Sequence, residues 1–166
     1  MLKKLLLLAL IAIPAVAFAQ EQKIAHVNRA DVIPLMPEYK QAQDSLVKSE
    51  NEFQAEFKRM QDEYLGKYSD YISKRDTLNE SIRLLREQEL QGMGQNVENF
   101  QQFAQQKQQE TEQALIAPVW AKFQKAVEEV GRENNFLYII AAEALLYSSP
   151  SAIDATPLIK KKLGIQ

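Results

Sequence analysis

The chain has 166 residues, no cysteine and a formal net charge of −2 at neutral pH. This length suits a single domain, and the lack of cysteine excludes disulfide bonds. The slight excess of acidic residues argues against a nucleic-acid partner, because nucleic acids bind surfaces rich in Lys and Arg.

Residues 1–19 have the pattern of a secretory signal peptide. Lys3 and Lys4 form a basic start, and the apolar run at 5–13 is too short to span a bilayer. Ala17-Phe18-Ala19 is a small-x-small cleavage site, so we expect cleavage after Ala19. An uncleaved membrane anchor is the alternative. Cleavage removes both lysines and takes the formal charge to about −4, and we expect the mature protein to be exported and soluble.

The mature chain is predicted to begin with a short strand and helical turns. Residues 23–28 alternate polar and apolar side chains, as one strand does. Residues 29–36 predict a helical turn or a short helix, which Pro34 interrupts. Pro37 suits the first turn of the next helix, where its missing N–H costs nothing.

A long helical region, residues 38–131, dominates the sequence. Its apolar residues recur at steps of three and four, which is the period of one buried helix stripe. The stripe is narrow and the other faces are charged, so the helix needs a partner helix. The stripe consists of Phe53, Phe57, Met60, Tyr64, Tyr68 and Tyr71, and after a polar gap of Leu78, Ile82, Leu85, Met93, Val97 and Phe100.

The region is predicted to fold into a helical hairpin, residues 37–117, that projects from a body as an arm. Thr77 and Glu80 fit a capping box, so we expect the first helix to cover residues 37–73 and the second to start at Thr77. One continuous helix that dimerises through the same stripe is the competing interpretation. The predicted pairs across the hairpin are Tyr71 with Ile82, Tyr68 with Leu85, Met60 with Met93, and Phe53 with Phe100.

Two features of the second helix predict weak packing. Gly92 and Gly94 each cost about 1 kcal/mol relative to Ala, either as tolerated surface positions or as a flexible point. Residues 101–113 contain seven glutamines, with only Phe103 and Ala104 as apolar members. A low-complexity tag is one interpretation. Because the helical pattern continues, a solvated helix face with loosely packed arms is the other.

Residues 20–36 and 118–166 are predicted to form the body. Pro118 marks either a kink or the first turn of a new helix. We expect strands at 136–142 and 144–147, and a final helix that Thr156 caps, with Pro157 at its first position. A second apolar stripe follows Pro118 and consists of Val119, Phe123, Ala126, Val127 and Val130.

These strands are too few for a stable isolated sheet, so the body is expected to build an oligomer. Three copies could close a shared sheet. The residues assigned to this oligomerisation body are Ile24, Val27, Phe136, Tyr138, Ile139, Ile140, Leu145 and Leu146.

The sequence contains no persuasive catalytic constellation. His26 is the only histidine, it lies mid-strand, and no serine sits in an elbow-type motif. Metal sites usually need a cluster of His or Cys, or a dense carboxylate loop. Gly92-Met93-Gly94 lacks the preceding strand and the spacing of a phosphate loop. We therefore predict that the protein is not an enzyme and uses no cofactor or metal.

The mature chain resembles the Skp/OmpH family of periplasmic chaperones. No matching piece is specific alone, but their order, their spacing and the signal peptide together make the resemblance. The pieces are Lys23–Val27, a long Gln/Glu/Lys-rich helical region, Ala117–Val119, Lys125–Val130, Asn135–Ile140, Asp154–Thr156 and Leu158–Lys160.

The resemblance implies a mainly α fold with a small β body, in which a long antiparallel coiled-coil hairpin projects from a trimeric β-barrel-like body. It implies an ATP-independent periplasmic holdase. Such a chaperone holds unfolded outer-membrane β-barrel proteins in a cavity between helical arms and keeps them soluble for membrane insertion. A structural or adaptor coiled-coil protein of the cell envelope is the alternative. Some family members also bind lipopolysaccharide.

One departure concerns charge, because well-known family members are strongly basic and this mature chain is slightly acidic. A peripheral membrane or lipopolysaccharide contact is a possible partner that the resemblance implies, but the slightly acidic charge does not support it. Around the predicted tip, Lys67, Lys74, Arg75, Arg83 and Arg86 are offset by Asp70, Asp76, Glu80 and Glu87.

Two sets of arm residues are candidates for contact with an unfolded client. The first set lies off the stripe, where apolar side chains have no predicted partner: Leu65, Ile72, Leu84 and Leu90. The second set lies on the stripe and could instead zip the arms together: Tyr64, Tyr68 and Met93.

Overall fold

The computed structural model describes residues 23–165. The predicted signal peptide and its cleavage site lie outside the described residues. The elements in chain order are β1 (Lys23–Val27), η1 (Arg29–Asp31), η2 (Ile33–Leu35), α2 (Pro37–Lys74), η3 (Arg75–Thr77), α3 (Glu80–Glu133), β2 (Phe136–Ala141), η4 (Ala142–Ala144), β3 (Ile153–Asp154) and α4 (Thr156–Leu163).

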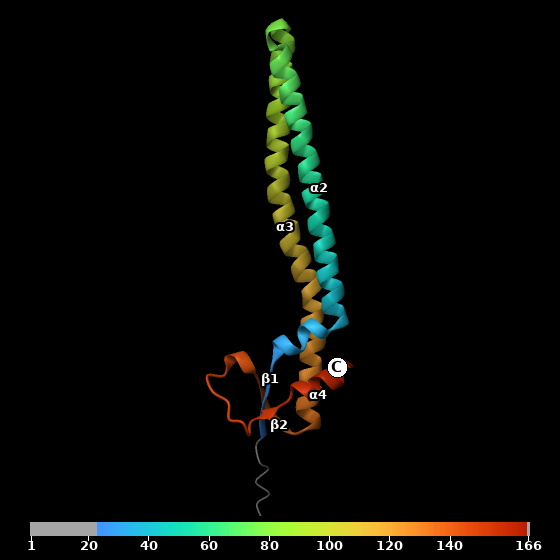
Figure 1. The fold of residues 1–166 in the computed structure, drawn as a ribbon, viewed down its shortest axis with the longest axis vertical. Coiled ribbons are helices and arrows are strands. Elements are labelled where there is room, and N and C mark those ends of the chain that lie inside the picture. The colour runs from blue at the N-terminus through green and yellow to red at the C-terminus, as the bar shows by residue number, and fades with distance from the viewer. Residues whose placement is uncertain (1–22, 166) are drawn as a thin grey trace, which may run out of the picture.

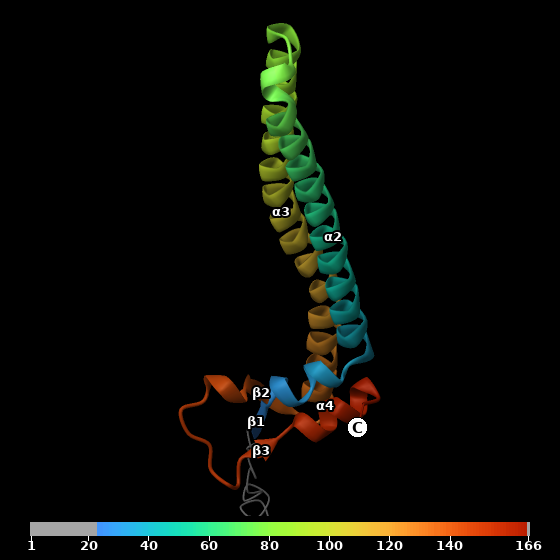
Figure 2. The same cartoon turned by 45° about the horizontal axis from the view of Figure 1, so that its top comes forward.

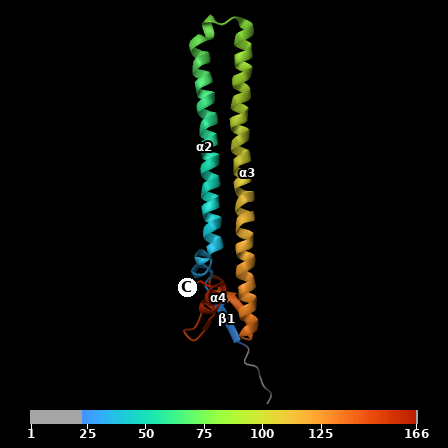
Figure 3. The same cartoon turned by 90° about the vertical axis from the view of Figure 1, so that its right-hand side faces the viewer.

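Two long helices, α2 and α3, lie side by side and form an arm that rises from a small body (Figures 1 and 3). The short turn η3 joins them at the tip, so the chain has two helices here and not one continuous helix. Ion pairs link the helices near the tip, between Lys67 and Glu89, and near the body, between Glu38 and Lys122. The two helices therefore run in opposite directions along the arm.

The cap of α3 differs from the prediction. Thr77 lies in the turn, and its hydroxyl donates a hydrogen bond to the Lys74 carbonyl at 2.7 Å. Helix α3 begins at Glu80, and the Asn79 side chain accepts a hydrogen bond from the Ile82 N–H at 2.9 Å. Asn is at least as good an N-cap as Thr, so the later of two competing caps starts the helix.

Pro118 neither ends α3 nor starts a new helix, because the helix continues unbroken from Glu80 to Glu133. A proline inside a helix costs about 3 kcal/mol. The residues that follow offset this cost, since Val119 and Phe123 are buried in the body core. The stripe predicted after Pro118 thus packs as expected, except that Val127 is only partly buried.

The core of the body lies where the lower end of α3 meets β1, the 3-10 turns and α4. Figure 2 shows these elements gathered at the foot of the arm. The buried apolar residues are Ala25, Val27, Val32, Met36, Val119, Phe123, Ala126, Val130, Ala155 and Ile159. A core this small stabilises a domain only marginally.

A three-stranded parallel sheet, ordered β2-β1-β3, forms the other part of the body. Ala25 is paired with Ile139 on one side and with Ile153 on the other. The strand predicted at residues 144–147 is wrong: η4 and an irregular loop cover this segment, and the third strand is β3. The apolar run there has no neighbouring strand within the described chain, and Leu146 is fully exposed.

Helix α4 starts at Thr156, but this residue is not its cap. The Asp154 carboxylate accepts a hydrogen bond from the Thr156 N–H at 2.9 Å. The Thr156 hydroxyl instead accepts a hydrogen bond from the Asn28 N–H at 3.0 Å. The threonine thereby joins α4 to the end of β1, two segments that are far apart in the sequence.

Candidate functional site

The outer faces of the arm carry exposed apolar side chains, which cluster in its tip half. They lie on both helices, so the apolar surface belongs to the arm as a whole. The exposed fractions are 58% for Leu65, 46% for Tyr68 and 51% for Ile72 on α2, and 40% for Ile82, 56% for Leu84 and 59% for Leu85 on α3. We call these six residues the tip surface.

The seam between the helices follows the predicted stripe near the middle of the arm. Phe53 and Phe100 meet edge to face with ring centroids 6.2 Å apart, as the predicted pairing requires. Phe103 also lies against Phe53, at 6.5 Å. A cavity of about 330 Å³ lies beside this contact, and it is lined by Phe53, Phe57 and Phe100 and by glutamines such as Gln101 and Gln105.

Nearer the tip, the seam of α3 departs from the prediction. Leu85 is 59% exposed, so the predicted Tyr68–Leu85 pair does not lie between the helices, whereas Leu90 is buried at 9% beside Tyr71. Leu85 and Met93 are eight residues apart, and over this distance an α-helix makes two full turns plus about 80°. The two side chains therefore do not lie on the same face. Leu90 lies three residues before Met93 and therefore shares its face. Leu90 is therefore part of the seam and not of the outer faces.

A groove of about 410 Å³ lies between the helices in the tip half, and we call it the tyrosine groove. Tyr64, Tyr68 and Tyr71 line it from α2, and the rings of Tyr64 and Tyr68 stack at 6.2 Å. From α3 it is lined by Glu87, Leu90, Gln91, Gly94, Gln95 and Glu98. The candidate residues Tyr64 and Tyr68 thus share one concave surface.

One hydrogen bond crosses this groove, from the Tyr71 hydroxyl to the Glu87 carboxylate. This bond is the main reason why the pKa of Tyr71 lies above its usual value, because it favours the neutral phenol. Arg75 lies close enough to Tyr71 to oppose the shift. The bond ties α2 to α3 below the tip turn.

The body also exposes apolar side chains, mainly on β2 and on the loop that follows it. That loop extends away from the body in Figures 1 and 2. Among the predicted body residues, Val27 is buried, while Phe136 and Ile139 pack partly against the core. The exposed ones among them are Ile24 at 51%, Tyr138 at 59% and Leu146 at 106%, and outside that predicted set Leu137 at 48% and Tyr147 at 79% are exposed as well.

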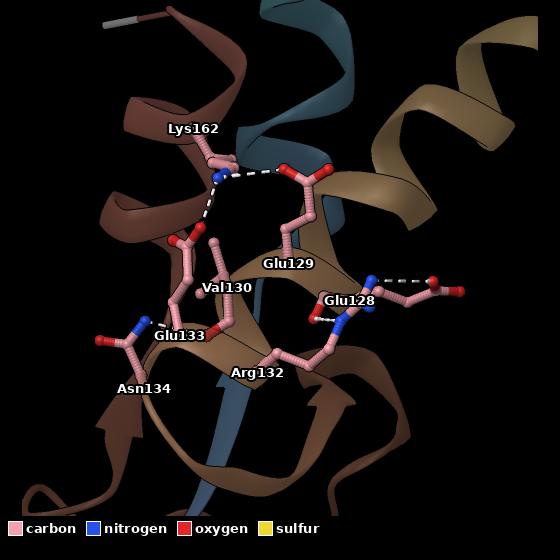
Figure 4. A network of polar contacts seen from close by, with 7 residues as sticks. All are labelled: Glu128, Glu129, Val130, Arg132, Glu133, Asn134 and Lys162. Atoms are coloured by element: carbon pink, nitrogen blue, oxygen red, sulfur yellow. Dashed lines mark hydrogen bonds and ion pairs between the residues drawn. The ribbon is translucent and has the colours of Figure 1, made fainter.

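Two polar clusters hold the arm to the body. Arg29 forms an ion pair with Glu143, and its guanidinium lies 5.4 Å from the centre of the Trp120 ring, within cation–π range. Lys162 on α4 bridges Glu129 at 3.0 Å and Glu133 at 2.6 Å on α3, as Figure 4 shows. The foot of α3 is therefore fixed by charges on two sides.

Residues 23–165 contain neither a metal-binding cluster nor a helix that could span a membrane. No set of three or more His, Cys, Asp or Glu side chains in this range could hold a metal ion. None of the helices in the same range combines the length and the apolar character that crossing a bilayer requires.

Comparison with models of known protein families shows to which family the chain belongs. The family model described as "Outer membrane protein (OmpH-like)" matches residues 23–163, which include the whole arm and nearly all of the described body. The chain belongs to the OmpH-like family. The OmpH-like match contains both the arm and the strands that flank it, so the two parts described above form one family unit.

A solved structure supports the same fold. The chain is similar to an OmpH-like outer membrane chaperone from Caulobacter crescentus CB15, with a TM-score of 0.76 and 15% sequence identity. The similarity covers 84% of this chain and 82% of that one. A search of curated proteins found no match. At this identity, the similarity establishes the OmpH-like fold and no more.

Proposed function

We propose that this OmpH-like chain is a periplasmic holdase chaperone that works without ATP. It binds unfolded outer-membrane β-barrel proteins between helical arms and keeps them soluble until membrane insertion. Its membership of the family supports this role, as does the chaperone name of the similar Caulobacter structure. The observation that carries the proposal is the tip surface, whose side chains are 40–59% exposed on a two-helix arm.

Exposed side chains of this kind suit a client that has no fixed shape. Apolar burial is non-directional, so several separate contacts can bind many different segments weakly. Leu65, Ile72 and Leu84 are the proposed client contacts on the outer faces, together with Tyr68. Tyr64 and Met93 are half-buried and contribute from the seam side, while the buried Leu90 is left out.

The body is proposed to assemble a homotrimer. A short three-stranded sheet with exposed Leu137 and Tyr138 leaves apolar surface that association can bury. Three copies would close their strands into one barrel-like body, and the three arms would then surround a shared cavity. This arrangement excludes other chains from a bound client.

Lipopolysaccharide is not part of the proposal. Near the tip, Lys67 and Arg86 both pair with Glu89, and Lys74 pairs with Asp70. Phosphate groups would have to compete with these carboxylates for each cation. The slightly acidic net charge of the chain adds a general repulsion.

Light scattering tests the holdase directly. Several denatured barrel proteins are diluted into buffer with and without the full mature chain. Suppressed scattering for most of them supports the proposal. Binding to one folded partner, without effect on the denatured proteins, would instead assign the adaptor role.

A triple variant tests whether the tip surface is the part of the arm that binds the client. Leu65→Ser, Ile72→Ser and Leu84→Ser together should weaken suppression, since each side chain is more than half exposed and packing is little affected. Val47→Ser is the matched control, because Val47 is 55% exposed on the lower half of α2. Equal loss in both variants would show that the tip surface has no special role.

A further inference from the structure

The tyrosine groove shares Tyr68 with the tip surface, but its other lining residues give it a different chemistry. Three tyrosines and two carboxylates, Glu87 and Glu98, line it, and its lining includes no Lys or Arg. Tyrosine rings attract cations through their π faces, and a carboxylate adds a charge-assisted hydrogen bond. We propose that the groove binds arginine side chains of extended, unfolded polypeptide segments.

The two ends of the groove differ in what is already occupied. At the tip end, Glu87 accepts the hydrogen bond of Tyr71, and Arg75 lies close to the same tyrosine. At the other end, Glu98 forms no ion pair with any residue of the described chain. The carboxylate of Glu98 is therefore the one that a ligand cation meets.

The geometry favours arginine over lysine. The rings of Tyr64 and Tyr68 are nearly parallel, at 22°, and Tyr68 is 46% exposed, so an aromatic face is within reach of solvent. A planar guanidinium can stack on such a ring and still donate two hydrogen bonds to one carboxylate. An ammonium group is a compact point charge and does not stack in this way.

The tyrosine groove is open at Gly94 because glycine has no side chain to fill it. A Cβ atom built on Gly94 would lie 3.8 Å from Tyr64 Cε2, in ordinary contact, so a longer side chain there would fill the groove. A Cβ atom on Gly92 meets nothing within 4 Å. The two glycines lie on the same helix and differ in what they face, so they form a matched pair of positions.

This inference rests on the proposed function only for the source of the ligand, which is an unfolded client. The test uses the full mature chain and a short, unstructured fluorescent peptide with one arginine. A second peptide carries citrulline, the uncharged analogue of arginine, at that position. Anisotropy titrations give the dissociation constant of each.

The expected preference of the native chain for the arginine peptide is about five- to thirty-fold, the range of a partly desolvated cation–π contact. Gly94→Leu and Glu98→Gln should reduce it to about one-fold, while Gly92→Leu and the charge-matched Glu112→Gln should keep it. Circular dichroism verifies that helix content is unchanged.

A native preference near one-fold would overturn the inference, as would an undiminished preference in Gly94→Leu. If the chain still suppresses aggregation of barrel proteins under either result, only the arginine site fails. If it binds neither peptide and suppresses no aggregation, the holdase proposal fails with it.

Discussion

Phe53 on α2 and Phe100 on α3 meet edge to face across the middle of the arm, at 6.2 Å between ring centroids and an angle of 62°. This contact sets the register of the two helices where the surrounding seam is rich in glutamine. Above it the seam holds the tyrosine groove, and below it the helices run down to the body core.

A double-mutant cycle should detect this contact. Phe53→Leu and Phe100→Leu are expected to show a coupling free energy of about 0.5–1.5 kcal/mol, the range for aromatic pairs. Urea unfolding at fixed protein concentration measures it. Phe53→Leu combined with Leu85→Ala serves as the control and should be additive, since Leu85 is exposed and lies in the tip half. Additivity in both cycles would mean that the ring contact contributes nothing.

Replacing Gly92 and Gly94 with Ala should stiffen the arm. Neither added Cβ meets an atom closer than 3.8 Å, so the gain in helix propensity of about 1 kcal/mol per site is not lost to crowding. Hydrogen exchange of the amides in the tip half of α3 should slow, while that of the body stays the same. If the arm must bend around clients, the variant will also hold a narrower range of client sizes. Unchanged exchange would show that the two glycines do not soften the arm.

Phe123→Ala should destabilise the body by about 3–5 kcal/mol, since this residue is 5% exposed in the core and the truncation leaves a cavity. Thermal unfolding followed by circular dichroism measures the loss. Gln124→Ala, at an exposed neighbouring position, should change stability by less than about 0.5 kcal/mol. Equal stability of the two variants would contradict the core described here.

A charge on β2 should separate assembly from folding. Tyr138 is 59% exposed in a single chain, so Tyr138→Asp is expected to abolish the proposed trimer and leave the helices intact. Ile139 packs against the core of its own chain, so Ile139→Asp should disturb folding as well. Size-exclusion chromatography with light scattering gives the mass of each variant. A Tyr138→Asp protein that remains trimeric would exclude β2 from the interface.

The contribution of the Lys162 bridge should depend on pH. The hydrogen bond from Lys162 is the main reason why the pKa of Glu129 is lowered. The stabilisation is therefore fully present above the usual pKa of a glutamate and is lost as pH falls through the lowered pKa. Glu133 and then Glu129 raise the pKa of Lys162, so the bridge also persists until pH rises through that pKa. Lys162→Met should therefore lower Tm at neutral pH and have no effect in strong acid. The control is Lys161→Met, because Lys161 lies outside this bridge. The difference in Tm between this variant and the native chain should not change with pH in the same way.

Much of the architecture followed from spacing alone. Val119, Phe123, Ala126 and Val130 recur at steps of four, three and four, and all four are buried in the body. Phe53 and Phe100 lie equally far in sequence from a point between Asp76 and Thr77, which predicts that they pair across a hairpin, and the turn η3 lies at that point. Such patterns are local, because helix periodicity determines which side chains share a face.

Tertiary structure decided the choices between similar local signals. Thr77 and Asn79 are both acceptable caps, and in the structure it is the Asn79 side chain that accepts the hydrogen bond of the Ile82 N–H at the start of the second helix. Leu85 and Leu90 are both apolar, and only the face shared with Met93 and Tyr71 determines which of them is buried. The apolar run at residues 144–147 forms a loop, because a strand needs a hydrogen-bonding neighbour and residues 23–165 do not offer it one. The tyrosine groove likewise exists only once Tyr64 and Gly94 face each other, since a concave site requires two surfaces and one helix supplies only one.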